Sequence, residues 1–425
     1  MASGAATGRE ALASNLIGNG DNRSRPARLQ CVDGLLEAVW QRQWAQRPTL
    51  DPDALIRIAE ARTGTSLLSD RGAWRDRLSL LCSDLEQVAS LTPLGRTIAH
   101  GQLVAAISNR ARAQLLWKRR PQILDQPIRA LVIVVGQMRS GTTRMQRLLA
   151  CDSRLAHTRF YESWNPIPLG IERGVLDERK LRGQLALIVA RLLNPKFDTI
   201  HPTAWNAADE EIGFQSISIF GSAFEVQWRV PSFRDAVEND DGETAYTEFK
   251  RLLKTVAWLR RERADRPWIL KVPQFTQDLP ALLRAFPDAR LIFVTRDERE
   301  VIASSASLVR NQMAVQSELV DADWIGREWT RKVRLRDQRM KAFLQSHSGP
   351  SVEVAYDAME NDWEMEMGRV YSILGLALPG PLLTKMRNLM RAAKSGKHRQ
   401  HVYRDEEFGL EDWRARQDSN LQLQA

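Results

Sequence analysis

Hydrophobic positions along the chain follow two different periods. Between about residues 30 and 120, apolar residues recur with helical spacing, as in the stripe Leu35, Leu36, Val39 and Trp40. This spacing predicts amphipathic helices. After residue 130, short continuous apolar runs appear, and each is followed by helical spacing. The runs predict strands at 131–135, Trp268–Pro273, Arg290–Thr295 and Val352–Tyr356.

The order of these elements predicts an α/β fold. Apolar runs without a polar face are typical of strands buried on both sides of a parallel sheet. Because strands alternate with helices, we expect a parallel sheet flanked by helices. Ligands bind beyond the carboxyl ends of the strands in such sheets. Candidate site residues follow all of the predicted strands, so we expect the functional site at that edge.

Composition and pattern divide the chain into segments. Residues 1–28 are small, polar and rich in Gly, Ser and Asn, which predicts a disordered leader. We expect a helical N-terminal region at 29–125, an α/β domain at 126–410 and a tail at 411–425. The stretch 150–267, between the first two predicted strands, is longer than a crossover requires. We expect it to set the specificity of the site, because long excursions at a site usually carry that role.

The first predicted strand runs into the turn GQMRSGTT, residues 136–143. Gly136 and Gly141 allow a tight turn that exposes consecutive N–H groups, and helical spacing follows. N–H groups at a helix N-terminus bind anions. A Walker A loop would have lysine where this chain has Thr142, whereas Arg139 lies two residues before the second glycine. The turn therefore predicts a phosphate-binding loop with its cation in a different place from that of ATP-binding loops.

Charge and cysteine content narrow the class of protein. The formal net charge of +9 favours anionic ligands. The three cysteines form no CxxC pair and there is no HExxH motif, so we expect no disulfide framework and no metal site. No apolar run is long enough to cross a bilayer, so we expect no membrane span and a cytoplasmic location. The basic residues of Trp324–Lys341 surround their helix instead of forming one stripe, which favours an ion-paired or solvated face over nucleic-acid binding.

The RSGTT core of the turn resembles the 5′-phosphosulfate loop of sulfotransferases that use 3′-phosphoadenosine 5′-phosphosulfate (PAPS). Arg296 follows a predicted strand and Ser304 lies on the next predicted helix, which resembles the family motif that holds the 3′-phosphate. The resemblance covers about Ala130–Leu410. It implies transfer of a sulfuryl group from PAPS to a hydroxyl or amine of an acceptor that the sequence does not identify.

Two later segments extend the resemblance. VEVAYDAM is similar to a family segment whose aromatic residue, here Tyr356, lies by the adenine; a tyrosine packed at a strand end is an equal alternative. SGKHRQHVYRDEEFGL resembles the closing segment of bacterial members, in which the residues matching Lys397 and His398 fold over the 3′-phosphate. The nucleotide-binding residues that the resemblance implies are Arg139, Ser140, Gly141, Thr142, Thr143, Arg296, Ser304, Tyr356, Lys397 and His398.

The expected catalytic residues are Glu162, Lys271 and Arg139. Glu162 falls where tyrosylprotein and some carbohydrate sulfotransferases have a catalytic glutamate, although a capping or salt-bridged glutamate is the alternative. Glu210 and Glu211 are the reserve candidates for the base. Lys271 matches a family lysine that faces the transferring group, and Arg139 is placed to donate to the phosphosulfate in a fork.

The chain departs from the family pattern at two positions. Relatives commonly have K-x-P-x-H and HRD, but this chain has Phe275 and Thr295 in place of those histidines. These departures favour a glutamate base or altered acceptor chemistry. They also leave a non-catalytic sulfotransferase-like scaffold as one alternative, beside a P-loop kinase or NTPase. A homo-oligomer formed through the helical N-terminal region is open as well.

Overall fold

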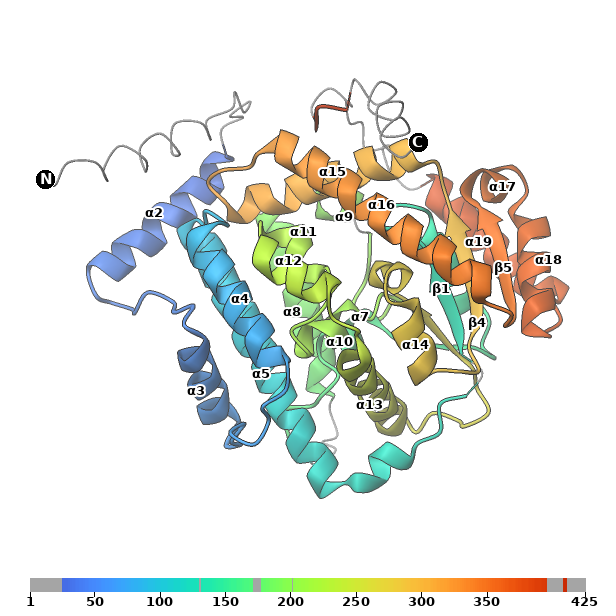
Figure 1. The fold of residues 1–425 in the computed structure, drawn as a ribbon, viewed down its shortest axis with the longest axis horizontal. Helices are drawn as coiled ribbons and strands as arrows, with labels where there is room; N and C mark the ends of the chain where they lie inside the picture. The colour runs from blue at the N-terminus through green and yellow to red at the C-terminus, as the bar shows by residue number, and fades with distance from the viewer. Residues whose placement is uncertain (1–24, 130, 171–176, 201, 396–407, 411–425) are drawn as a thin grey trace, which may run out of the picture.

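The computed structural model describes residues 25–129, 131–170, 177–200, 202–395 and 408–410 of the chain (Figure 1). The described part begins with helices that cover one side of the molecule. Their bounds are α2 Ala27–Gln41, α3 Pro52–Thr63, α4 Trp74–Gln87 and α5 Pro93–Arg119, followed by the short 3-10 helix η1 Pro121–Asp125.

A parallel sheet with the strand order β2-β3-β1-β4-β5 forms the centre of the fold, which confirms the predicted α/β class. Its strands are β1 Val132–Val135, β2 Ala156–His157, β3 Trp268–Lys271, β4 Arg290–Thr295 and β5 Ser351–Ala355. The pattern did not predict β2, because two residues are too few to show a period. Since β1 lies between β3 and β4, the carboxyl ends of these strands and of β5 meet at one edge.

The central strand is buried on both faces. Ile133 and Val135 pack into a core that includes residues of α5, α10 (Ile212–Ile217), α13 (Glu243–Arg260) and α14 (Leu279–Ala285). Val132 and Val134 point to the other side, into a core with α6 (Thr142–Ala150), α18 (Trp363–Leu374) and α19 (Gly380–Ser395). Side chains alternate along a strand, so burial on both faces requires the continuous apolar run.

The long stretch after α6 folds into short helices. It contains α7 Phe160–Trp164, α8 Glu178–Leu193, α9 Phe197–Ile200, α10, α11 Ala223–Gln227, α12 Pro231–Glu238 and α13. Between Ile212 and Phe224 the apolar residues have helical spacing, which predicts a single helix. It is interrupted, because Ile219 (φ 46°) and Gly221 (φ 91°) adopt left-handed conformations that end α10 before α11 begins.

The remaining helices lie around β4 and β5. They are η2 Pro273–Thr276, α15 Glu298–Gln316, α16 Ala322–Ser346 and α17 Tyr356–Asn361. On the basic helix α16, Lys332 is buried and pairs with Glu225 and Glu238. Arg331 pairs with Glu238 and Glu328. These charges are therefore neutralised within the protein. Within the described ranges, no helix is long and apolar enough to cross a membrane.

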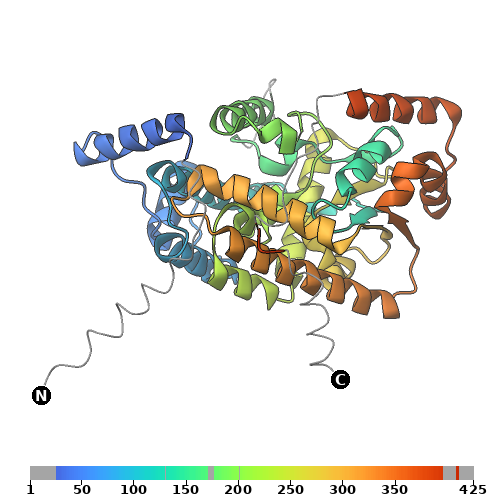
Figure 2. The same ribbon diagram turned by 90° about the horizontal axis from the view of Figure 1, so that it is seen from above.

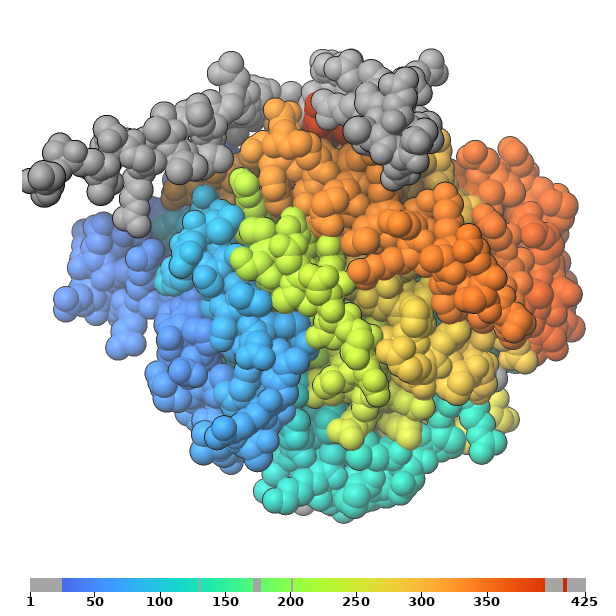
Figure 3. Space-filling model, in the orientation of Figure 1, coloured from blue at the N-terminus to red at the C-terminus, as the bar shows by residue number. Residues whose placement is uncertain are grey.

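The N-terminal helices pack directly on the rest of the molecule. The space-filling view shows α4, in blue, against α12, in yellow-green (Figure 3). Asp84 of α4 accepts a hydrogen bond from the Phe233 N–H of α12 at 2.9 Å. At the start of α5, the Thr92 N–H donates to the carbonyl of Gln316 at the end of α15 (3.0 Å). A Cβ added at Gly95 would lie 1.9 Å from that same carbonyl oxygen.

Gly95→Ala tests this packing. We expect the substitution to lower the free energy of unfolding by about 1–3 kcal/mol, because the added methyl group forces α5 away from α15. Gly101→Ala is the matched control, since Gly101 lies in the same helix with no atom within 4 Å of the added Cβ. The control should be stabilising by roughly 0.5–1 kcal/mol, because alanine favours a helix. Urea denaturation followed by circular dichroism measures both; equal stability of the two variants would contradict the packing.

Candidate functional site

The glycine loop passes through a narrow space at the carboxyl end of β1. Gly141 adopts φ 99° and caps the N-terminus of α6. A Cβ on Gly141 would lie 2.9 Å from the ring of Tyr356, and one on Gly136 would lie 2.6 Å from the carbonyl oxygen of Val294. Neither position has room for a side chain. The loop leads directly into α6, whose first turn leaves N–H groups without acceptors in the helix.

Arg139, Arg296 and Ser304 come together, although they are far apart in the sequence. The Arg139 Nε donates to the Ser304 hydroxyl on α15 at 3.0 Å. The Arg296 Nη1, which follows β4, donates to the backbone carbonyl of Arg139 at 2.9 Å. Arg139 has φ 70°, a left-handed conformation that is unfavourable for arginine. Its contacts with Arg296 and Ser304 hold the loop in that conformation.

Tyr356 lies between two guanidinium groups at the same edge. The Arg296 guanidinium carbon is 4.1 Å from the ring centroid, and that of Arg144 is 5.1 Å from it. Arg144 Nη2 also donates to Glu360 at 2.5 Å, whereas its buried Nη1 has no hydrogen-bond partner in the described structure. A buried guanidinium nitrogen without a partner fits an anion site. The motifs did not single out Arg144, because it differs from other helix arginines only through its contact with Tyr356.

Lys271 joins β3 to the first turn of α6. Its side chain is 1% exposed, and its Nζ pairs with Glu210 and donates to the Thr143 hydroxyl at 3.0 Å. The backbone N–H of Lys271 donates to the Glu211 carboxyl at 2.9 Å. The predicted lysine therefore lies beside the loop helix and beside both reserve glutamates.

The two reserve glutamates have different surroundings. The side chain of Glu210 is 12% exposed. Glu211 is completely buried, and one of its carboxyl oxygens has no hydrogen-bond partner among the described residues. Burial raises the pKa of Glu211 from 4.5 to about 8 and outweighs the hydrogen bond from the Lys271 N–H. Glu211 is therefore a mostly neutral carboxyl at neutral pH.

Glu162 is completely buried and forms an ion pair with the partly buried Arg260. It closes a capping box at the N-terminus of α7, where it accepts from the Arg159 N–H at 2.9 Å. Arg260 of α13 donates to both of its carboxylate oxygens, and the Tyr161 hydroxyl donates at 3.1 Å. Burial would raise the pKa of this carboxyl, but the hydrogen bonds from Arg260 outweigh burial and keep its pKa below the usual value. These contacts match the capping and salt-bridged alternative; a catalytic role for Glu162 stays a prediction.

The backbone next to Glu162 is hydrogen-bonded to the segment that carries Glu210 and Glu211. The backbone N–H of Phe160 donates to Ala207, and the N–H of Asp209 donates to Thr158. Residues 158–160 therefore run beside 207–209. The Arg-x-x-Glu spacing of the capping box is visible in the sequence, but Arg260 lies 98 positions from Glu162 and no local pattern connects the two.

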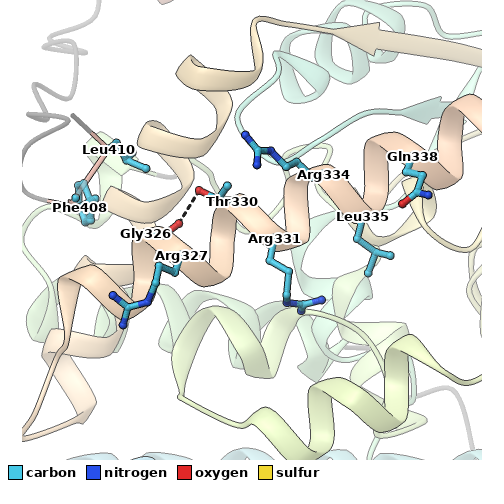
Figure 4. A pocket seen from close by; sticks show the side chains of 10 residues that line it. Gly326, Arg327, Thr330, Arg331, Arg334, Leu335, Gln338, Phe408 and Leu410 are labelled. Atoms are coloured by element: carbon cyan, nitrogen blue, oxygen red, sulfur yellow. Dashed lines mark hydrogen bonds between the residues drawn. The ribbon is translucent and has the colours of Figure 1, made fainter. Parts of the chain in front are cut away.

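The last described residues, 408–410, lie beside α16. Phe408 and Leu410 are buried against α15 and α16. They line a groove of about 480 Å³ along α16 together with Arg327, Arg331 and Arg334, and Figure 4 shows these side chains. None of the predicted site residues lines this groove. Lys397 and His398 lie outside the described residues.

Comparison with known proteins identifies the family. The sequence profile described as the sulfotransferase family matches residues 131–380, more than half of the chain. No curated protein matches the chain in sequence. The fold is similar to that of sulfotransferase STF1 from Mycobacterium tuberculosis H37Rv, with a TM-score of 0.73 and 22% identity over 86% of this chain and 97% of the other.

Sulfotransferase STF9 from Mycobacterium avium is similar as well, with a TM-score of 0.73 and 25% identity over 84% of this chain and 92% of the other. The matched region contains the glycine loop, the acidic pair and the strand ends that surround them. The chain belongs to the sulfotransferase family.

Proposed function

We propose that the protein transfers a sulfuryl group from PAPS to a hydroxyl or amine of an acceptor. The observation that carries the proposal is the link from Arg139 to Ser304 and Arg296, because these side chains lie together at one sheet edge and would bind anions in two groups. One group surrounds the glycine loop, and the other follows β4. A nucleotide with phosphates at both its 5′ and 3′ positions needs two such groups.

The residues at this edge fit the donor. Loop N–H groups and the side chains of Arg139, Ser140, Thr142 and Thr143 would bind the 5′-phosphosulfate. Arg296 and Ser304 would bind the 3′-phosphate, and the buried Arg144 nitrogen adds a further donor. When bound, PAPS supplies an activated sulfur and a phosphate leaving group. The resemblance assigns Lys397 and His398 to the same 3′-phosphate.

Lys271 and Glu210 are the residues that we assign to the chemical step. Glu210 takes the proton of the acceptor while the acceptor oxygen or nitrogen bonds to sulfur and the bond from sulfur to the phosphate oxygen breaks. Lys271 and Arg139 neutralise the charge that develops on that oxygen. We prefer Glu210 to Glu162 because Arg260 already occupies both oxygens of Glu162. Glu211 acts as a positioning residue through the backbone of Lys271.

The rival activity, a P-loop kinase or NTPase, has less support. Position 142 carries threonine, and Lys271 reaches the loop helix from β3 instead. The family match favours sulfuryl transfer. If the protein were a scaffold without catalysis, it would bind the nucleotide at most. Substitution of Glu210 would then change no transfer rate.

Nucleotide preference tests the donor assignment. We expect adenosine 3′,5′-bisphosphate to bind at least about tenfold more tightly than AMP, because a charged hydrogen bond to the 3′-phosphate contributes about 1.5–3 kcal/mol. Arg296→Gln should remove most of this preference. Arg334→Gln is the control, since Arg334 on α16 loses the same charge but pairs with Glu298 outside the site. Titration calorimetry measures the affinity of each of the three proteins for both nucleotides; equal affinity of the wild type for both nucleotides would reject the donor.

The base assignment is tested by paired glutamine substitutions. Glu210→Gln should lower the rate of sulfuryl transfer by about 10²–10⁴, the usual contribution of a general base, and leave bisphosphate affinity within about threefold. Glu162→Gln should lower the free energy of unfolding by about 1.5–3 kcal/mol, because the partly buried Arg260 loses its hydrogen bonds to a carboxylate and keeps only its longer ion pair with Glu262. Transfer from labelled PAPS into an extract of the source cells gives the rate. If folded Glu162→Gln loses the rate while Glu210→Gln keeps it, Glu210 is not the base.

The buried Glu211 predicts a pH dependence of stability. Its pKa is about 8 in the folded protein and 4.5 is its ordinary value, so the folded state holds the proton more strongly. As pH rises from 4.5 to 8, the contribution of Glu211 to the free energy of unfolding should therefore fall, by at most about 1.4 kcal/mol per pH unit. The stability of wild type relative to Glu211→Gln should fall over this range and level off above it. Exposed Glu37→Gln is the control; parallel curves for wild type and Glu211→Gln would contradict the raised pKa.

A further inference from the structure

Helix α8 has apolar side chains on the face that points away from the protein. Figure 2 shows this helix, in green, at the edge of the molecule. Spacings of four, three and four residues place the first four of these side chains in one stripe along the helix. The stripe consists of Leu181 (58% exposed), Leu185 (52%), Ile188 (50%) and Leu192 (68%), with Val189 (51%) beside it.

The fold does not need this stripe for its own packing. The opposite face of α8 holds the helix in place through Gly183 and Leu187, both of which are buried. A Cβ on Gly183 would lie 2.7 Å from the Cβ of Tyr161 in α7, so the two helices are in close contact. A surface helix normally has polar residues on its outer face. The outer face of α8 is apolar instead, which indicates a partner.

Cationic side chains border the stripe on both sides. Lys180 and Arg191 lie along one border, and Lys180 is exposed without an ion pair among the described residues. Arg182 lies on the other border, and its Nη1 is a buried nitrogen without a hydrogen-bond partner there. Arg112 of α5 is close to Arg182; burial first, and then this neighbouring charge, lower the pKa of Arg182. The nearby anions are Glu178 and Asp198, and Asp198 already pairs with Arg191.

The cations beside the apolar stripe favour one kind of partner over another. A second copy of this chain, docked antiparallel through the same surface, would bring Lys180 close to Arg191 of that copy, so that two cationic borders would meet. An anionic lipid surface takes up the leucines among its acyl chains and pairs the cations with its headgroups. We propose that the outer face of α8 docks the protein on a membrane surface that carries anionic lipids.

Docking through α8 would bring the candidate site to the membrane. Arg191 Nη2 donates to the Thr203 carbonyl at 3.0 Å, and the Thr203 hydroxyl donates to Asp209, next to the acidic pair. Asn194, just after α8, donates to Asn311 of α15 at 2.6 Å, and α15 carries Ser304. If the proposed function holds, the acceptor is then the hydroxyl or amine of an amphiphile that resides in the membrane.

Vesicle binding by the full chain tests the docking without using the transfer reaction. We expect the protein to sediment with vesicles of phosphatidylcholine and phosphatidylglycerol at least about tenfold better than with phosphatidylcholine alone. The triple substitution Leu185→Gln, Ile188→Gln and Leu192→Gln should reduce this binding by about tenfold or more, because it removes most of the apolar stripe. The control, Leu68→Gln with Leu319→Gln, changes leucines of 74% and 76% exposure away from α8 and should bind as wild type does.

The outcomes separate the docking from the function. A triple variant that melts as wild type and still binds adenosine 3′,5′-bisphosphate, but has lost vesicle binding, supports the docking. Equal binding of the triple variant and wild type, or no binding of wild type to anionic vesicles, overturns it. A wild-type dimer in sedimentation equilibrium that the triple substitution dissociates also overturns it, in favour of a second copy. Failure of nucleotide binding would reject the donor assignment and leave the vesicle result intact.

Discussion

The space around the glycine loop is the constraint on which the site depends. The loop passes between the Val294 carbonyl and the Tyr356 ring, and both approaches exclude a Cβ. This close packing brings the ends of β4 and β5 against the end of β1, so residues distant in sequence surround the loop. The Arg296 guanidinium then contacts both the loop carbonyl of Arg139 and the ring of Tyr356. A wider loop would lose these contacts together, because each depends on the same short distance between strand ends.

The three glutamates near this edge differ in charge state and in exposure to solvent, because they differ in burial and in ion-pair partners. Arg260 compensates the buried charge of Glu162, so that carboxyl remains ionised and links α7 to α13. Glu211 is buried without a cation on its carboxylate and has a raised pKa. Glu210 pairs with Lys271 and keeps some exposure. Only Glu210 combines a cationic neighbour at the loop with access from solvent, which is why the proposed mechanism gives it the proton transfer.

Hydrogen bonds at the end of α8 connect this helix to the candidate site. Its last turn is hydrogen-bonded to the segment that precedes the acidic pair, and the next residues contact α15. The long stretch between β1 and β3 therefore does more than close a crossover. It provides Glu162 to support the site, Glu210 and Glu211 beside Lys271, and an apolar helix on the outside. In the proposed function, this stretch positions the acceptor and turns the site toward the membrane in which the acceptor resides.

The sequence by itself determined the parallel α/β core and the glycine loop after β1, because both depend on local patterns. A strand buried on two faces needs an apolar run such as LVIVV, and a tight turn needs glycine at Gly136 and Gly141. The family resemblance added Arg296, Ser304 and Lys271, which the fold brings to one edge. The short β2 and the break between α10 and α11 were not predictable, since they depend on contacts and not on period. Only the tertiary structure decided which glutamate is neutral, which is ion-paired and which lies beside Lys271, because charge states follow from burial and from partners as distant in sequence as Arg260.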